Sequence, residues 1–95
     1  MAGKDSPLLR FGLGSALFNL KEYDEAIPHL QECLKQMPDH SAAWKLLGRC
    51  QMASGNDQAA VDVFQRGLEV AKKKSDIQVE REISVFLNKL ARKSD

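Results

Sequence analysis

The sequence predicts an all-α fold, a short solenoid of two helix–turn–helix units closed by a fifth helix. Apolar residues recur at helical spacing, and no segment alternates apolar with polar residues over the length of a strand. Proline and glycine divide the chain into pieces of ordinary helix length. The chain also matches itself at one offset: Leu13, Gly14 and Ala26 are each followed 34 positions later by the same residue.

The bulk composition is that of one small globular domain. The chain has 95 residues, of which 43% are hydrophobic and 28% charged. A formal net charge of +1 gives no overall field that would attract nucleic acid or an anionic membrane, so neither partner is expected. No apolar run approaches the roughly 20 residues that span a bilayer. The amino-terminal MAGKDSPLL lacks the long apolar stretch of a secretory signal.

The two cysteines, Cys33 and Cys50, stand in no spacing typical of a metal or redox site. We expect buried, reduced thiols and a cytoplasmic location. His29 and His40 have no serine, cysteine or acid suitably placed for catalysis, so no enzyme activity, metal or cofactor is expected.

The first helix is expected over residues 7–20, after a flexible N-terminus of residues 1–6. Ser6 suits the N-cap, and Pro7 suits the first helical position because its missing N–H is not needed there. This helix is apolar on more than one side, which indicates burial on two sides or a face that awaits a partner.

A tight turn over residues 21–23 leads to the second helix, expected over residues 24–36. Pro28 falls early in this helix, where the loss of one backbone hydrogen bond is mild. Met37 precedes Pro38 and is therefore pushed out of the helical region, which ends the helix.

Ser41 is the expected N-cap of the third helix, over residues 42–54. Gly55 and Asn56 break the chain, and Asn56 or Asp57 can cap the fourth helix, over residues 57–73.

Ser75 and Gln78 form a capping box for the fifth helix, expected over residues 76–92. Its apolar residues share one stripe, so this helix packs on one side and is solvated on the other. The stripe consists of Val79, Ile83, Phe86, Leu87 and Leu90.

These elements give a single domain over residues 7–95, with repeat one at 7–40, repeat two at 41–74 and a closing helix at 75–93. The second copy carries Trp44, Leu47, Gly48, Ala60 and Phe64. This pattern resembles the tetratricopeptide repeat (TPR) family, W-x2-L-G-x2-Y, then A-x3-F, then P.

The match is incomplete: Gln51 stands at the tyrosine place, and Arg10 stands at the tryptophan place of the first copy. The glycines let the two helices of a unit approach closely, with Ala26 and Ala60 expected opposite them. Trp44 and Phe64 are expected to fill the space between neighbouring units.

The resemblance implies a protein-interaction module with a concave groove lined by the first helix of each unit. The expected groove residues are Phe11, Ser15, Phe18, Asn19, Lys45, Arg49 and Met52. Lys45 and Arg49 lie four residues apart on one helix face and could hold a carboxylate of a bound protein or peptide. Two alternatives stay open, that both cations are only solvated surface residues and that Phe11 and Phe18 belong to the core.

The carboxylate clamp of some TPR domains is not expected, because Phe11, Ser15 and Leu46 stand at its places. Three lysines at residues 72–74 are expected to be a solvated helix end. The alternative function is self-association as a homodimer, or docking on a larger protein, through the apolar first helix.

Overall fold

A computed structural model describes residues 5–94, without the side chain of Ser94, and contains five helices and no strand within that range. The all-α, five-helix prediction is therefore confirmed. The predicted flexible N-terminus at residues 1–6 falls largely outside the described residues. The helices are α1 (Pro7–Asn19), α2 (Tyr23–Gln36), α3 (Ser41–Ala53), α4 (Asp57–Lys73) and α5 (Ile77–Ser94).

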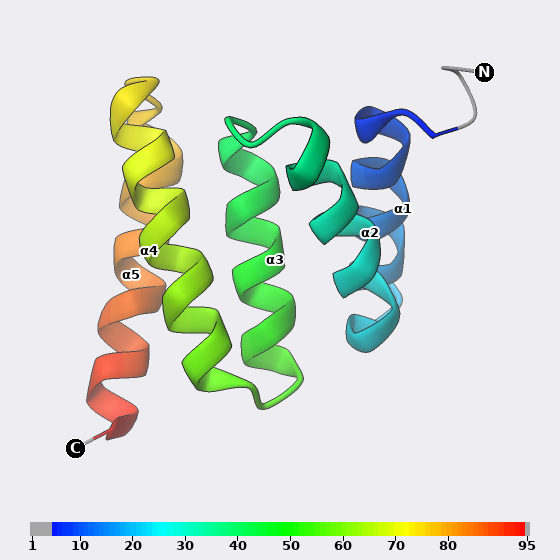
Figure 1. Cartoon of the computed structure of the whole chain (residues 1–95). Helices are drawn as coiled ribbons and strands as arrows, with labels where there is room; N and C mark the ends of the chain where they lie inside the picture. The colour runs from blue at the N-terminus through cyan, green and yellow to red at the C-terminus, as the bar shows by residue number, and fades with distance from the viewer. Residues whose placement is uncertain (1–4, 95) are drawn as a thin grey trace.

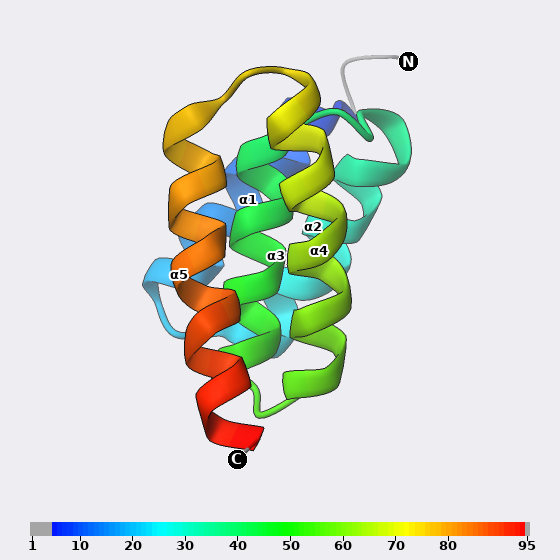
Figure 2. The same ribbon diagram turned by 90° about the vertical axis from the view of Figure 1, so that its left-hand side faces the viewer.

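Each helix packs mainly on the next one along the chain, and α3 also touches α1 and α5. The result is a flattened row of helices, 48 × 30 × 18 Å (Figure 1). The view turned by 90° shows α2 and α4 on one side of the molecule and α1 and α5 on the other, with α3 between them (Figure 2).

The first helix begins as predicted: the Ser6 hydroxyl accepts a hydrogen bond from the backbone N–H of Leu9 at 3.0 Å. The second begins one residue earlier than predicted, because Tyr23 already belongs to α2 and the turn is made by Lys21, whose φ is +63°.

The N-cap predicted for α3 is wrong. His40 holds that position, and its Nδ1 accepts from the N–H of Ala43 at 3.1 Å. Ser41 is the first helical residue, and its hydroxyl donates instead to the Asp76 carboxylate at 2.8 Å.

The capping box predicted for α5 is also wrong, because Asp76 caps this helix by accepting from the N–H of Val79 at 3.3 Å. Ser75 makes the preceding turn with a φ of +57°. Asn56 does hold the N-cap position of α4, but its side chain bonds to Gln51 at 3.1 Å rather than to the helix.

The two repeated glycines are the points where α1 meets α2 and α3 meets α4. A Cβ on Gly14 would lie 2.6 Å from the Leu30 side chain, and one on Gly48 would lie 2.3 Å from the Phe64 ring. Ala26 and Ala60 are fully buried, but Leu30 and Phe64 fill the space over the glycines. The placement of Ala26 and Ala60 opposite the glycines stays a prediction, because Leu30 and Phe64 supply the nearest atoms.

Trp44 links the two units. Its indole N–H donates to the backbone oxygen of Pro38 at 2.8 Å, and its Cβ lies 2.6 Å from where a Cβ on Gly67 would stand. Phe64 is fully buried, and its ring stacks on Phe86 of α5 with centroids 5.3 Å apart. Both aromatic residues therefore bridge neighbouring helical units, as the sequence predicts, although Trp44 is only partly buried.

Candidate functional site

Three adjoining hollows run across α1, α3 and α5, and Arg49 lines all three. The first, of ≈300 Å³, lies between α1 and α3, and its lining includes Phe11, Ser15, Phe18, Asn19, Lys45 and Arg49. The second, of ≈290 Å³, is lined by Phe18, Tyr23, Arg49, Met52, Ala53 and Phe86. The third, of ≈200 Å³, is lined by Lys45, Arg49, Glu82, Val85, Phe86 and Lys89. We call these three hollows together the α1–α3–α5 groove.

All seven residues expected from the sequence line this groove. Six of them meet in the hollow between α1 and α3, and Met52 lines the neighbouring one. Phe11 and Phe18 are partly buried and pack on the core cluster of α2 and α3 while also lining the groove. The two alternatives for these rings, core and groove wall, therefore both hold.

Arg49 lies between two aromatic rings. Its Cζ stands 4.7 Å from the ring centroid of Phe18 on α1 and 5.4 Å from that of Phe86 on α5. A guanidinium over a ring face is attracted by the ring quadrupole. This arrangement ties three helices together. No carboxylate of residues 5–94 pairs with the guanidinium, so its N–H groups can bind an anion.

Lys45, the other predicted cation, already has a partner. Its Nζ lies 2.9 Å from Oε1 of Glu82 on α5, and both side chains are partly buried. Arg49 has no ion pair with any carboxylate of residues 5–94, so the two cations differ in their availability to a bound anion.

Two further groove residues, Tyr23 and Glu82, could not be predicted from the sequence. The sequence pattern predicts a turn at Tyr23, yet this residue lines the groove, and its ring centroid lies 5.4 Å from that of Phe18. Glu82 lies outside the apolar stripe of the fifth helix, and its contact with Lys45 joins residues 37 positions apart, which no local pattern can predict. Phe86 differs from these two, because the family resemblance already implies a groove position for it on the fifth helix, and it lines two of the hollows.

A larger hollow, of ≈400 Å³, lies between α2, α3 and α4 on the other side of α3, with Trp44 and Leu47 among its lining residues. Its cations have acidic neighbours: Lys35 lies 3.9 Å from Glu32, and Arg66 lies 3.5 Å from Asp62. This hollow therefore lacks the unpaired cation that distinguishes the α1–α3–α5 groove.

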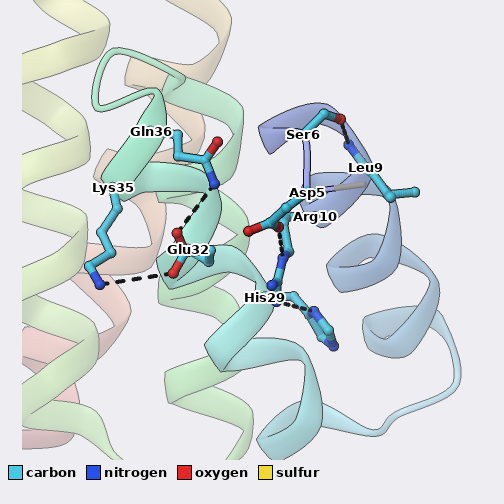
Figure 3. A network of polar contacts seen from close by, with 8 residues as sticks. All are labelled: Asp5, Ser6, Leu9, Arg10, His29, Glu32, Lys35 and Gln36. Carbon is cyan, nitrogen blue, oxygen red and sulfur yellow. Dashed lines mark hydrogen bonds and ion pairs between the residues drawn. The ribbon is translucent and has the colours of Figure 1, made fainter. Parts of the chain in front are cut away.

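A polar network joins the start of α1 to α2 (Figure 3). Arg10 donates from Nε to Asp5 at 2.6 Å, and its Nη1 lies 3.2 Å from Nδ1 of His29. The hydrogen bond to Asp5 raises the pKa of Arg10 above its ordinary value. Because His29 faces a permanent cation rather than a nucleophile, the network acts as a structural tie at the edge of the row.

Other site types find no support in the described residues. No group of three or more histidine, cysteine, aspartate or glutamate side chains within residues 5–94 could hold a metal ion. Cys33 and Cys50 are buried free thiols, and burial raises the pKa of Cys50 to about 11. In the described part of the chain, no helix is long and apolar enough to cross a membrane.

Comparison with known proteins places these features in a family. A family model described as tetratricopeptide repeat matches residues 17–78. A TPR repeat-containing protein of Pseudomonas aeruginosa is 43% identical over 90 residues, which cover 95% of this chain and 86% of that protein. The solution structure of a protein from Bordetella parapertussis is 40% identical, with a TM-score of 0.86 over 96% of this chain and 79% of the other. The crystal structure of a tetratricopeptide repeat domain protein from Salinibacter ruber, 20% identical, shares the fold with a TM-score of 0.82 over 90% of this chain and 97% of the other.

Proposed function

The chain belongs to the tetratricopeptide repeat family, and on this premise we propose that it is a non-catalytic module that binds a segment of another protein in the α1–α3–α5 groove. Members of this family are generally protein-interaction modules. We also propose the division into repeat one (7–40), repeat two (41–74) and a capping helix (75–93), which is supported by the packing of α1 on α2 and α3 on α4.

The observation that carries the proposal is the position of Arg49 between Phe18 and Phe86. Its cation lies at the centre of a partly apolar groove and has no carboxylate partner within residues 5–94. A carboxylate of the bound segment would form charge-assisted hydrogen bonds with the guanidinium edge. Apolar side chains on either side of that carboxylate would contact Phe18, Met52 and Phe86.

Arg49 is the first-choice anion receptor, and Lys45 is a secondary one. Lys45 would have to exchange its 2.9 Å contact with Glu82 for a contact with the ligand. The sequence-based proposal that Lys45 and Arg49 together hold a carboxylate thus becomes a proposal in which Arg49 is available and Lys45 is engaged by Glu82.

We further propose a reducing, cytoplasmic setting and no nucleic-acid partner. The buried free thiols of Cys33 and Cys50 support the first. The second is supported by the net charge of +1 and by Lys74, whose ammonium already donates to the backbone oxygen of Asp39 at 3.0 Å.

A library of displayed peptides, selected on the immobilised protein, tests groove binding. Selected peptides should share an acidic residue flanked by apolar residues, and Arg49→Gln should weaken their binding at least tenfold. The matched control is Arg66→Gln, because Arg66 is an exposed arginine of α4 away from the groove. Equal affinity for the wild type and Arg49→Gln would refute the role of Arg49.

A second candidate function, docking through the apolar first helix, is favoured by a separate observation. Among residues 5–93, six large hydrophobic side chains are exposed, and four of them lie on α1 or directly after it, namely Leu8, Leu9, Leu13 and Leu20. This surface lies outside the groove, so the two functions can coexist.

A further inference from the structure

The outer face of α1 carries a continuous uncharged stripe. Leu9, Leu13 and Leu20 expose 48%, 41% and 70% of their surface, and Gly12 and Ala16 between them are also exposed. At 3.6 residues per turn these five positions share one side of the helix. We call them the outer stripe.

The outer stripe is not part of the core or of the groove. The α1 helix packs on α2 at Gly14, over which Leu30 lies, and it meets α3 through Phe18 and Phe11. A Cβ added to Gly12 would meet nothing within 4 Å, so the described chain leaves this side of the helix open. An exposed apolar patch of this kind marks an interaction surface more often than a scattered exposed leucine does.

We propose that the outer stripe binds the outer stripe of a second copy of this chain, with the two α1 helices antiparallel about a two-fold axis. This takes the second candidate function further and does not depend on groove binding. The evidence that the partner is a second copy is the order of residues in the stripe, since a two-fold contact requires a surface that is complementary to itself.

The spacing of the stripe is the same in both directions. Four of its five members, Leu9, Leu13, Ala16 and Leu20, are separated by 4, 3 and 4 positions, so their pattern is symmetric about its centre; Gly12 adds no side chain to it. In an antiparallel pair, Leu13 of one copy therefore lies opposite Ala16 of the other, a large residue against a small one. Leu9 lies opposite Leu20 at each end of the contact.

Electrostatics also favour a second copy. The stripe has no charged member, so no like charges meet across the two-fold axis. Antiparallel helices place the positive end of one dipole beside the negative end of the other. Arg10, the only charged residue within Pro7–Asn19, is held by Asp5 and His29 on the side toward α2.

The size of the stripe sets the strength of the dimer. A helix of 13 residues is about 20 Å long, whereas a standard interface buries about 800 Å² on each partner. One helix face is smaller than that, so we expect a reversible dimer with a dissociation constant of micromolar or weaker.

Sedimentation equilibrium over a range of concentrations tests the dimer. The wild-type mass should rise from one chain toward two, and Ala16→Glu should keep it at one chain because a carboxylate would be buried against Leu13 of the second copy. The control is Ala91→Glu, the same change at an exposed position of α5, which should dimerise like the wild type. A wild type that stays monomeric at all concentrations, or an Ala16→Glu variant that still dimerises, would overturn the proposal.

Cysteine cross-linking tests the orientation. A mixture of Leu9→Cys and Leu20→Cys chains should form a disulfide between copies, whereas Leu9→Cys alone should not. The native Cys33 and Cys50 are fully buried and should not interfere. Cross-linking of Leu9→Cys with itself would instead show a parallel pair and overturn the antiparallel arrangement. Peptide binding by Ala16→Glu distinguishes the dimer proposal from the groove-binding proposal, since this variant should be monomeric and should still bind the selected peptides with wild-type affinity.

Discussion

The ring of Phe64 occupies the space over Gly48 in which any other residue would carry its side chain. A Cβ on Gly48 would lie 2.3 Å from Cε1 of Phe64. The ring cannot easily retreat, because Phe64 is fully buried and stacks on Phe86 with centroids 5.3 Å apart. We therefore expect Gly48→Ala to lower the free energy of unfolding by about 1–3 kcal/mol, the usual cost of overpacking a core.

Gly12→Ala is the matched control, because it makes the same change in a helix where the new methyl group meets nothing within 4 Å. It should raise stability by about 0.5–1 kcal/mol through the helix preference for alanine. Urea unfolding at a concentration where the chain is monomeric measures both. Equal stability of the two variants would contradict the contact between Phe64 and Gly48.

The example of Gly48 shows what the sequence could and could not predict. The offset that pairs Gly14 with Gly48 predicts close helix contacts, because a glycine repeated inside two helices indicates that there is no space for a side chain at either position. Which side chain of α4 lies over Gly48 depends on the rotation of α4 about its own axis. The sequence does not specify this rotation, so it cannot decide between Ala60 and Phe64. The repeat pattern thus predicts the fold well and the individual contacts less well.

The same limit applies to the groove. The spacing of Lys45 and Arg49 on one helix predicts that they share a face. Nothing local indicates that Lys45 meets Glu82 while Arg49 lies between Phe18 and Phe86, since these contacts join three different helices. The N-cap of α3 cannot be predicted from the sequence for a related reason. Serine is a favourable N-cap residue, but the hydroxyl of Ser41 donates to Asp76, which lies 35 positions away.

Glu82→Gln should strengthen the binding of acidic peptides. The change removes the carboxylate that holds Lys45 at 2.9 Å, so that Lys45 can contact the ligand beside Arg49. We expect the affinity to rise severalfold, while stability changes by less than about 1 kcal/mol, as for other exposed or half-exposed ion pairs. Isothermal titration calorimetry with a peptide selected on the wild type measures the affinity.

Glu69→Gln serves as the control for Glu82→Gln, because Glu69 is an exposed carboxylate of α4 outside the groove. It changes the net charge equally and should leave the affinity within about twofold at physiological salt, where distant charges are screened. If both variants bind more tightly by the same factor, overall charge and not Lys45 explains the gain.

Trp44→Ala should destabilise the chain by about 3 kcal/mol, at the lower end of the range for tryptophan truncation. The sequence alone suggests a cost of up to about 5 kcal/mol, but Trp44 is only partly buried, which lowers the expected value. Trp44→Phe keeps much of the packing against Gly67 but loses the hydrogen bond to Pro38. It should therefore destabilise the chain by about 1 kcal/mol, the net value of one hydrogen bond. Thermal melts by circular dichroism compare the two, and an unchanged melting temperature for Trp44→Ala would contradict its role between the units.

The thiols of Cys33 and Cys50 should react with alkylating reagents only when the chain unfolds. Both are fully buried, and burial raises the pKa of Cys50 to about 11, so the reactive thiolate is scarce at pH 8. Because the folded pKa lies above the ordinary value of 9.0, stability from this group is complete below pH 9 and is lost as the pH rises toward 11. Mass spectrometry after timed labelling should show labelling that follows unfolding by urea, and rapid labelling of the folded chain would refute the burial.

The contact between Ser41 and Asp76 should make stability depend on pH in the acid range. The Asp76 carboxylate accepts from the Ser41 hydroxyl at 2.8 Å and from the N–H of Val79 at 3.3 Å, and these bonds lower its pKa below the ordinary 3.8. A lowered folded pKa means that the contribution is present above pH 3.8 and is lost as the pH falls through the lowered value. Asp76→Asn can still cap α5 but cannot titrate, so the wild type should lose more stability than this variant between pH 5 and pH 2. Urea unfolding at several pH values measures the difference, and parallel pH profiles for the two proteins would show that Asp76 makes no such contribution.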